Sequence, residues 1–161
     1  MFKLGTMVKD RVTGLKGMLT HAQYEGGNYM YAFQPHGLNP KNQEPVDGLW
    51  IAPDRISDGV EVPIPQQFND AIGVLGSEVE DQGSGFKGIA VAAILHISGC
   101  VHIDIQPSGV VKETGEPIKR HNFDIRRLHG KAIKQMSEAE RDQDQERRPS
   151  PAPLPRRRLG V

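Results

Sequence analysis

Cysteine and histidine side chains that could bind a metal ion lie close together in the second half of the chain. Cys100 and His102 are two residues apart, so on a strand both point to the same face, and His121 could reach them from a neighbouring strand. The three positions do not follow the spacing of a known zinc motif. We therefore expect no metal site and expect Cys100 to be a small core residue. Cys100 is the only cysteine, which excludes an intrachain disulfide.

Two glycine-rich runs could be compared with a phosphate-binding loop. They read VTGLKG over residues 12–17 and GSGFKG over residues 83–88. Both lack the spacing of a Walker or dinucleotide-binding motif, and no long helix follows to point its N-terminus at a phosphate. Turns explain these runs better. No serine stands in a nucleophile-elbow sequence, and Cys100 has no histidine and acid partner defined by the sequence. We expect no enzyme activity, no catalytic residue and no cofactor.

The two glycine-rich runs belong to a long internal repeat. Residues 4–17 and 75–88 are identical at seven of fourteen positions with an offset of 71. After one inserted residue the match continues with an offset of 72, through Gln34/Gln106 to Arg55/Arg127. A repeat of this length indicates one small domain that has been copied, not a solenoid unit. The shared residues are mostly glycine, proline and apolar residues, which shape a fold more than they carry chemistry.

Each copy reads as short strands separated by turns. Beta-forming residues come in short runs near residues 6–10, 16–24, 28–34 and 48–51, with a closing strand after Ile56. Glu25-Gly26-Gly27-Asn28 predicts a tight hairpin, and residues 97–100 are its counterpart. Five short, bent strands in each copy favour a small SH3-like barrel.

The predicted fold is all-β, with two tandem small SH3-like barrels followed by a C-terminal helix and an extended arm. Proline stiffens the link between the copies, where residues 66–72 could form a short helical turn. The helix has a capping-box sequence, and proline ends it. The expected boundaries are 1–62 for the first repeat, 63–74 for the linker, 75–130 for the second repeat, 131–147 for the helix and 148–161 for the Pro/Arg-rich arm.

The run V-x-D-x-x-[TS]-G-[LF]-K-G resembles the KOW-type motif of small SH3-like barrels in ribosomal proteins and transcription-elongation factors. The longer pattern is similar to small proteins of tailed bacteriophages, through DRVTGLKG at 10–17, the Gly-Gly hairpin, Gln34-Pro35, and LWI at 49–51 before DRI at 54–56. The second copy departs from this pattern, since Gly83 replaces Val12. The resemblance implies the fold and a phage setting, and it carries over no catalytic or binding residue.

Candidate binding residues come from the surface expected for such barrels. Lys16 and Lys87 occupy equal positions in the two copies and could touch an acidic partner or simply be solvated. Tyrosines of the first copy lie on a strand face that is either core or interface. The matching face of the second copy is aliphatic, which favours core for Tyr31 and Phe33. The better interface candidates are Tyr24 and Trp50.

The C-terminal tail is the remaining binding candidate. It combines stiff prolines with Arg147, Arg148, Arg156, Arg157 and Arg158. One reading is an arm that folds onto an acidic neighbour, and the other is a disordered extension without function. The formal net charge of the whole chain is +0, so there is no global basic field for nucleic acid.

We expect a non-enzymatic structural or accessory protein of a tailed phage, a capsid decoration protein or another virion component that binds a protein lattice. Its partners would be other phage structural proteins of the capsid or tail, or further copies of itself. It would reside in the virion, and in the host cytoplasm before assembly. The longest apolar run, residues 89–95, is too short for a membrane helix. The alternative is a phage-encoded regulator that binds a host protein or nucleic acid through its KOW-like turns.

Overall fold

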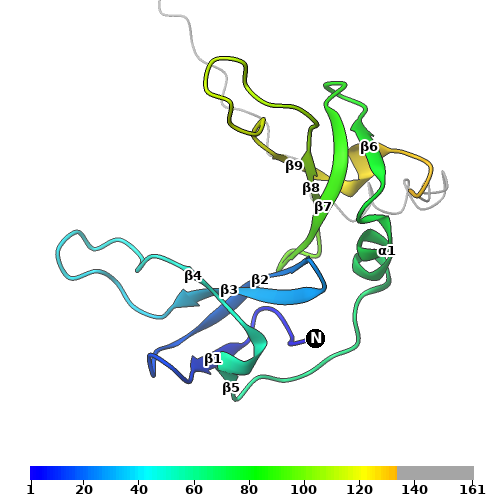
Figure 1. The fold of residues 1–161 in the computed structure, drawn as a ribbon. Coiled ribbons are helices and arrows are strands. Elements are labelled where there is room, and N and C mark those ends of the chain that lie inside the picture. Colours follow the sequence, from blue (N-terminus) through cyan, green and yellow to red (C-terminus); the bar gives the residue numbers. More distant parts are fainter. Residues whose placement is uncertain (134–161) are drawn as a thin grey trace, which may run out of the picture.

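The computed structural model describes residues 1–133 (Figure 1). The expected helix over 131–147 lies outside the described residues from residue 134 on, and the arm over 148–161 lies entirely outside them.

The two copies have the same order of strands, as the internal repeat predicted. In the first copy all pairs are antiparallel and the order is β5-β1-β2-β3-β4, and in the second it is β10-β6-β7-β8-β9. The first copy comprises β1 (Met7–Asp10), β2 (Lys16–Glu25), β3 (Asn28–Pro35), β4 (Leu49–Ile51), the 3-10 turn η1 (Pro53–Arg55) and β5 (Ile56–Ser57). The second comprises β6 (Glu78–Asp81), β7 (Lys87–His96), β8 (Val101–Gln106), β9 (His121–Asp124), η2 (Ile125–Arg127) and β10 (Leu128–His129).

The all-β prediction is confirmed, and the strands form one 10-stranded sheet. Within the described residues no pairing joins β4 to β5, or β9 to β10, so the sheet of each copy stays open. The structure therefore does not confirm closed barrels.

In each copy, glycines occupy the positions where the backbone turns sharply or approaches another strand closely. The β2–β3 hairpin turns at Gly26 and Gly27, whose φ angles of 58° and 85° suit the primed turn that joins two twisted strands. Gly17 and its counterpart Gly88 are required for a different reason, the close approach of a neighbouring strand. A Cβ atom at either would lie 2.3 Å from the carbonyl oxygen of Gln34 or Gln106, respectively. Two strands could not approach so closely with any side chain there.

The copies join through an antiparallel pairing of β2 with β7, which we call the seam. It runs from His21 opposite His96 to Glu25 opposite Ala92. At its centre Gln23 lies opposite Ile94, its own counterpart in the repeat. A pairing centred on equivalent residues is symmetric, so the copies meet about an approximate twofold axis, as subunits do in an isologous dimer.

The helix α1 (Gln66–Val74) lies in the predicted linker and packs against β7 and β8 beside the seam (Figure 1). It buries Phe68, Ala71 and Val74, and the Phe68 ring lies 6.5 Å from that of Tyr29 in the first copy. The apolar core is continuous across both copies. Tyr31 and Phe33 belong to this core, as predicted, together with Leu19, Ile51, Val79, Val101, Ile103 and Ile105.

Candidate functional site

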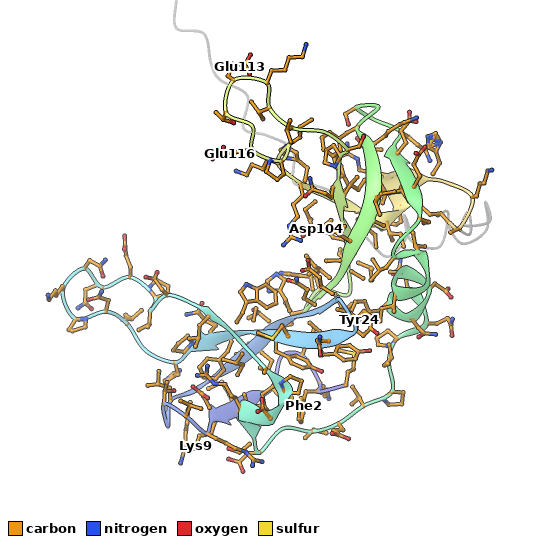
Figure 2. The ribbon with its side chains drawn as sticks, in the orientation of Figure 1. Phe2, Lys9, Tyr24, Asp104, Glu113 and Glu116 are labelled. Atoms are coloured by element: carbon orange, nitrogen blue, oxygen red, sulfur yellow. The ribbon has the colours of Figure 1, made fainter. Side chains whose placement is uncertain are left out.

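The face of the sheet opposite the core collects polar and aromatic side chains where the copies meet, and we call it the junction face. Strand register places these residues in rows across the strands. The first row runs from Trp50 through Ala32 and His21 to His96. The second is Met30, Gln23, Ile94, His102 and Asp124, and the third is Asn28, Glu25, Ala92, Asp104 and Asn122. In Figure 2 Asp104 lies on the open side between the copies, whereas Tyr24 lies toward α1.

Aromatic rings connect the first row. Ala32 is small, so the Trp50 ring approaches His21 to 6.2 Å between centroids while remaining 45% exposed. Across the seam the rings of His21 and His96 stand edge to face at 4.4 Å. The row therefore brings together one indole and two imidazoles, and both copies contribute rings to it.

Hydrogen bonds fix the tautomers of two junction histidines. The backbone N–H of Ser98 donates to Nδ1 of His96 at 3.1 Å, so a neutral His96 carries its proton on Nε2. His102 has the opposite arrangement. Asn122 donates through Nδ2 to Asp104, and its Oδ1 therefore accepts from His102 Nδ1 at 2.6 Å.

Charged groups cross the seam beside the histidines. Arg120 lies before β9 and donates to Glu25 of the first copy at 2.8 Å, and it also lies 3.6 Å from Asp104. Gln23 donates to the second carboxylate oxygen of Glu25 at 2.6 Å. Asp124 pairs with Arg126. Carboxylates and arginines of the junction face thus neutralise each other.

The surroundings change the acidity of two groups here. Burial lowers the pKa of His21, and the nearby imidazoles of His96 and His102 lower it further, because each disfavours a positive charge. Burial alone would raise the pKa of Asp124. The hydrogen bonds from Arg126 outweigh that effect, and the pKa is lowered.

A second pair of polar sites lies at the glycine turns. Asp10 and Asp81 are fully buried and occupy equal positions in the repeat. Asp10 accepts hydrogen bonds from Nε of Arg55 at 3.0 Å and from the Thr13 hydroxyl at 2.5 Å. Asp81 accepts from Nε of Arg127 at 2.9 Å and, in the position of Thr13, from Ser84.

These bonds hold both turn carboxylates in the charged form. The Arg55 bond is the largest influence on Asp10 and holds its pKa far below the usual range. The bond from Ser84, with that from Arg127, lowers the pKa of Asp81 to about 2. Fully bonded carboxylates of this kind tie a turn to the end of its repeat, and they suit structure rather than acid–base catalysis.

The residues expected to bind partners lie in different places. Lys16 and Lys87 are exposed at the starts of β2 and β7, and Lys87 lies 3.6 Å from Glu78. Trp50 is exposed on the junction face, whereas Tyr24 is partly buried on the core side with its ring 4.9 Å from Tyr29. The tail residues Arg147, Arg148, Arg156, Arg157 and Arg158 lie outside the described residues.

The possible metal ligands do not come together. His102 is opposite Asp124 and His121 is opposite Ile105, so the two histidines occupy different rows. The His121 ring packs on Phe86 at 5.1 Å. Residues 1–133 contain no group of three His, Cys, Asp or Glu side chains that could hold a metal ion. The prediction that Cys100 is a core residue is wrong, because it is only partly buried in the turn before β8.

Two long loops extend from the sheet and share one internal design. The first arm (residues 36–48) joins β3 to β4, and the second arm (residues 108–120) joins β8 to β9. From here on, 'arms' refers to these two loops and not to the C-terminal segment. They leave on the same side of the molecule (Figure 1), and Glu113 and Glu116 lie far out on the second arm (Figure 2). Gln34 donates through Nε2 to the Val46 carbonyl, and Gln106 donates likewise to Ile118.

Each arm exposes an apolar residue at the same position. Leu38 is 56% exposed and bridges to Pro45, and Val110 is 55% exposed and bridges to Pro117. A backbone turn fixes both tips. The N–H of Asn39 donates to the Glu44 carbonyl at 2.8 Å, and the same bond recurs between residues 111 and 116.

Searches of protein-family models, of curated proteins and of solved structures found no match to this chain. Over the part of the chain that the structure describes, none of the helices has the length and apolar character needed to span a membrane.

The sequence analysis missed the junction face. His21 and His96 belong to different copies and are not equivalent positions in the repeat. Alternation along β2 could have placed His21, Gln23 and Glu25 on one face, but their partners across the seam depend on how the copies meet.

Proposed function

We propose that the chain is a non-enzymatic structural or accessory protein of a tailed bacteriophage, which binds a repeating protein surface as a capsid decoration protein or another virion component. We also propose that each copy is a small SH3-like barrel that the partner or neighbouring segments complete. The proposal locates the chain in virions, and in the host cytoplasm before assembly.

The two arms are the observation that carries this proposal. Exposed loops in a duplicated sequence are under little packing constraint, yet both arms keep an exposed apolar residue just before the turn at the tip, its proline partner and the carboxylate of Glu44 or Glu116. Exposed apolar side chains at equivalent positions of two protruding loops support a role in protein contact, because removal of apolar surface from water favours association. Two such arms on one chain would bind two equivalent sites, and a regular protein lattice offers such sites. Linked binding of this kind gains affinity through effective concentration.

A chemical role has less support in the described residues. The buried carboxylates Asp10 and Asp81 are saturated with hydrogen bonds, and the carboxylates of the junction face pair with Arg120 and Arg126. A group that must exchange protons or attack a substrate would need to be free to do so.

Mass spectrometry of purified virions tests the setting. We expect the chain in many copies per particle. Absence from particles would contradict the proposal and favour the regulator that binds nucleic acid or a host protein. Nucleic-acid binding would then weaken steeply as the salt concentration rises.

Point variants test the arms with particles that lack the protein. We expect Leu38→Ser and Val110→Ser each to weaken binding, and the double variant to weaken it about 10²-fold or more because avidity is lost. Val12→Ser is the matched control, since Val12 is 72% exposed but lies outside the arms. Equal binding by the double variant and the control would rule out the arms as attachment sites.

A further inference from the structure

The seam carries a pair of titratable rings on its outer end. His21 and His96 are the first of its residue pairs, and their rings are 4.4 Å apart. Protonation of both would place two positive charges on opposite sides of a strand pairing that joins the halves of the molecule. His102, on β8, adds a third imidazole in the next row.

The hydrogen bonds of His96 give a second reason why acid should destabilise the seam. Nδ1 of His96 accepts the Ser98 N–H and lies 2.8 Å from the Ser98 hydroxyl. A proton on Nδ1 would turn this acceptor into a donor that faces another donor. The bond from the Ser98 N–H would then be lost, and only the Ser98 hydroxyl could accept from the protonated Nδ1.

Among the described residues, few negative charges lie close enough to stabilise protonated histidines at the seam. The elements around His21 contribute Ala32 from β3, Trp50 from β4 and the imidazoles of His96 and His102. Glu25 and Asp104 lie two rows away and face Arg120. Asp124 faces His102 across β8 and β9 but is held by Arg126.

We propose that the His21–His96 pair makes the repeat junction sensitive to pH. At neutral pH the two rings are uncharged and the seam stays closed. In mildly acidic solution their protonation opens the seam, while the outer strands of each copy stay paired. The proposal does not rest on the proposed function. Its sign follows from linkage. An open seam leaves His21 with its usual pKa of 6.5, and closure lowers that pKa. The open state therefore binds more protons, and the stability of the seam is complete above pH 6.5 and decreases as the pH falls below it.

Hydrogen–deuterium exchange of the full chain tests the proposal. Peptides that contain residues 21–25 and 92–96 should exchange several-fold faster at pH 5.5 than at pH 7.5, after correction for the intrinsic rate, because acid populates the open seam. Peptides that cover β1 and β6 should keep their protection. Unchanged protection at the seam, or an equal loss at β1 and β6, would overturn the proposal.

Substitutions assign the effect to the two rings. His21→Gln with His96→Asn removes both imidazoles, and the Asn side chain can still accept the Ser98 N–H as in an Asx turn. We expect seam protection in this double variant to be the same at both pH values. The matched control is His121→Gln, because His121 packs on Phe86 outside the seam, and it should behave like the unaltered chain. A double variant that still loses protection in acid would overturn the proposal.

Fluorescence of the unaltered chain provides a measurement that needs no variant. Trp50 is the only tryptophan and lies beside His21, and an imidazolium quenches indole emission on contact. We expect quenching on acidification with a midpoint below 6.5, in line with the lowered pKa of His21. A midpoint at or above 6.5 would show that the folded chain does not resist protonation there, and would contradict the proposal.

Discussion

Two buried aspartates explain several identities in the repeat at once. Asp10 and Asp81 each accept hydrogen bonds from an arginine just before the last strand of the copy and from a hydroxyl in the glycine turn. A buried carboxylate is costly unless its oxygens are fully bonded. Aspartate, hydroxyl and arginine therefore had to be kept together in both copies.

The carboxylate sites predict a specific dependence on acid. Because the pKa of Asp81 falls from the usual 3.8 to about 2 on folding, its contribution to stability is present above pH 3.8 and is lost as the pH falls toward 2. Asp81→Asn should lower the urea midpoint at pH 7 and flatten its decline below pH 3.8. Asp58→Asn is the control, since Asp58 is exposed and asparagine tolerates its φ of 62°. An equal decline in Asp81→Asn and the control would show that the turn carboxylate does not drive acid unfolding.

The close approach at Gly17 and Gly88 predicts a large effect from a single methyl group. An added Cβ would lie 2.3 Å from a backbone carbonyl oxygen, which cannot move without displacing its strand. Gly17→Ala and Gly88→Ala should each destabilise the fold by about 2 kcal/mol or more. Gly73→Ala in α1 is the matched control. It meets nothing within 4 Å and should stabilise the fold by about 0.5–1 kcal/mol. Thermal melts compare the three, and equal melting temperatures would contradict the predicted clash.

At the scale of elements, each arm depends on one side chain of the strand before it. Gln34 and Gln106 occupy equal positions, and each amide donates across its arm to a carbonyl twelve residues on. An arm of this length would otherwise lose much of its order to chain entropy. The shared Gln-Pro pair in the sequence thus marks an arm anchor as well as the end of a strand.

Replacing the amide with a carboxylate tests this anchor. Gln34→Glu and Gln106→Glu keep the side-chain size but replace the N–H donor with an oxygen that faces a carbonyl, at a cost of about 1–3 kcal/mol. We expect faster cleavage within the arms in limited proteolysis. Gln67→Glu is the control, because Gln67 is exposed in the first turn of α1, where a negative charge is favourable. Cleavage at the rate of the control would mean that the backbone alone orders the arms.

Local patterns predicted the elements well because they depend on nearby residues. Residues 28–34 were expected as a strand that follows a Gly-Gly turn, and β3 is Asn28–Pro35. The seam could not be predicted in this way. Gln23 and Ile94 meet because two copies pair about a twofold axis, and nothing local to either residue specifies that contact. Closure into barrels was inferred from strand number and resemblance, and strand number does not determine whether edge strands pair.

For the whole molecule, the shared core matters more than the division into copies. The seam continues the sheet from one copy to the other, and α1 places Phe68 against Tyr29 beneath it. A small copy buries little apolar surface alone, so the joint core supplies stability that neither half has by itself. We infer that at neutral pH, where the seam is closed, the two copies unfold together.

Trp50 allows that inference to be tested, since the only tryptophan lies in the first copy. Ile103 is fully buried in the second copy, and Ile103→Ala should destabilise the fold by about 2–5 kcal/mol. If the copies unfold as one unit, the urea transition followed by Trp50 fluorescence should shift as far as the transition followed by circular dichroism. The matched control is Ile97→Ala, because Ile97 is 44% exposed in the same copy and should shift both transitions little. A Trp50 transition that stays in place while circular dichroism shifts would show that the first copy folds independently of the second.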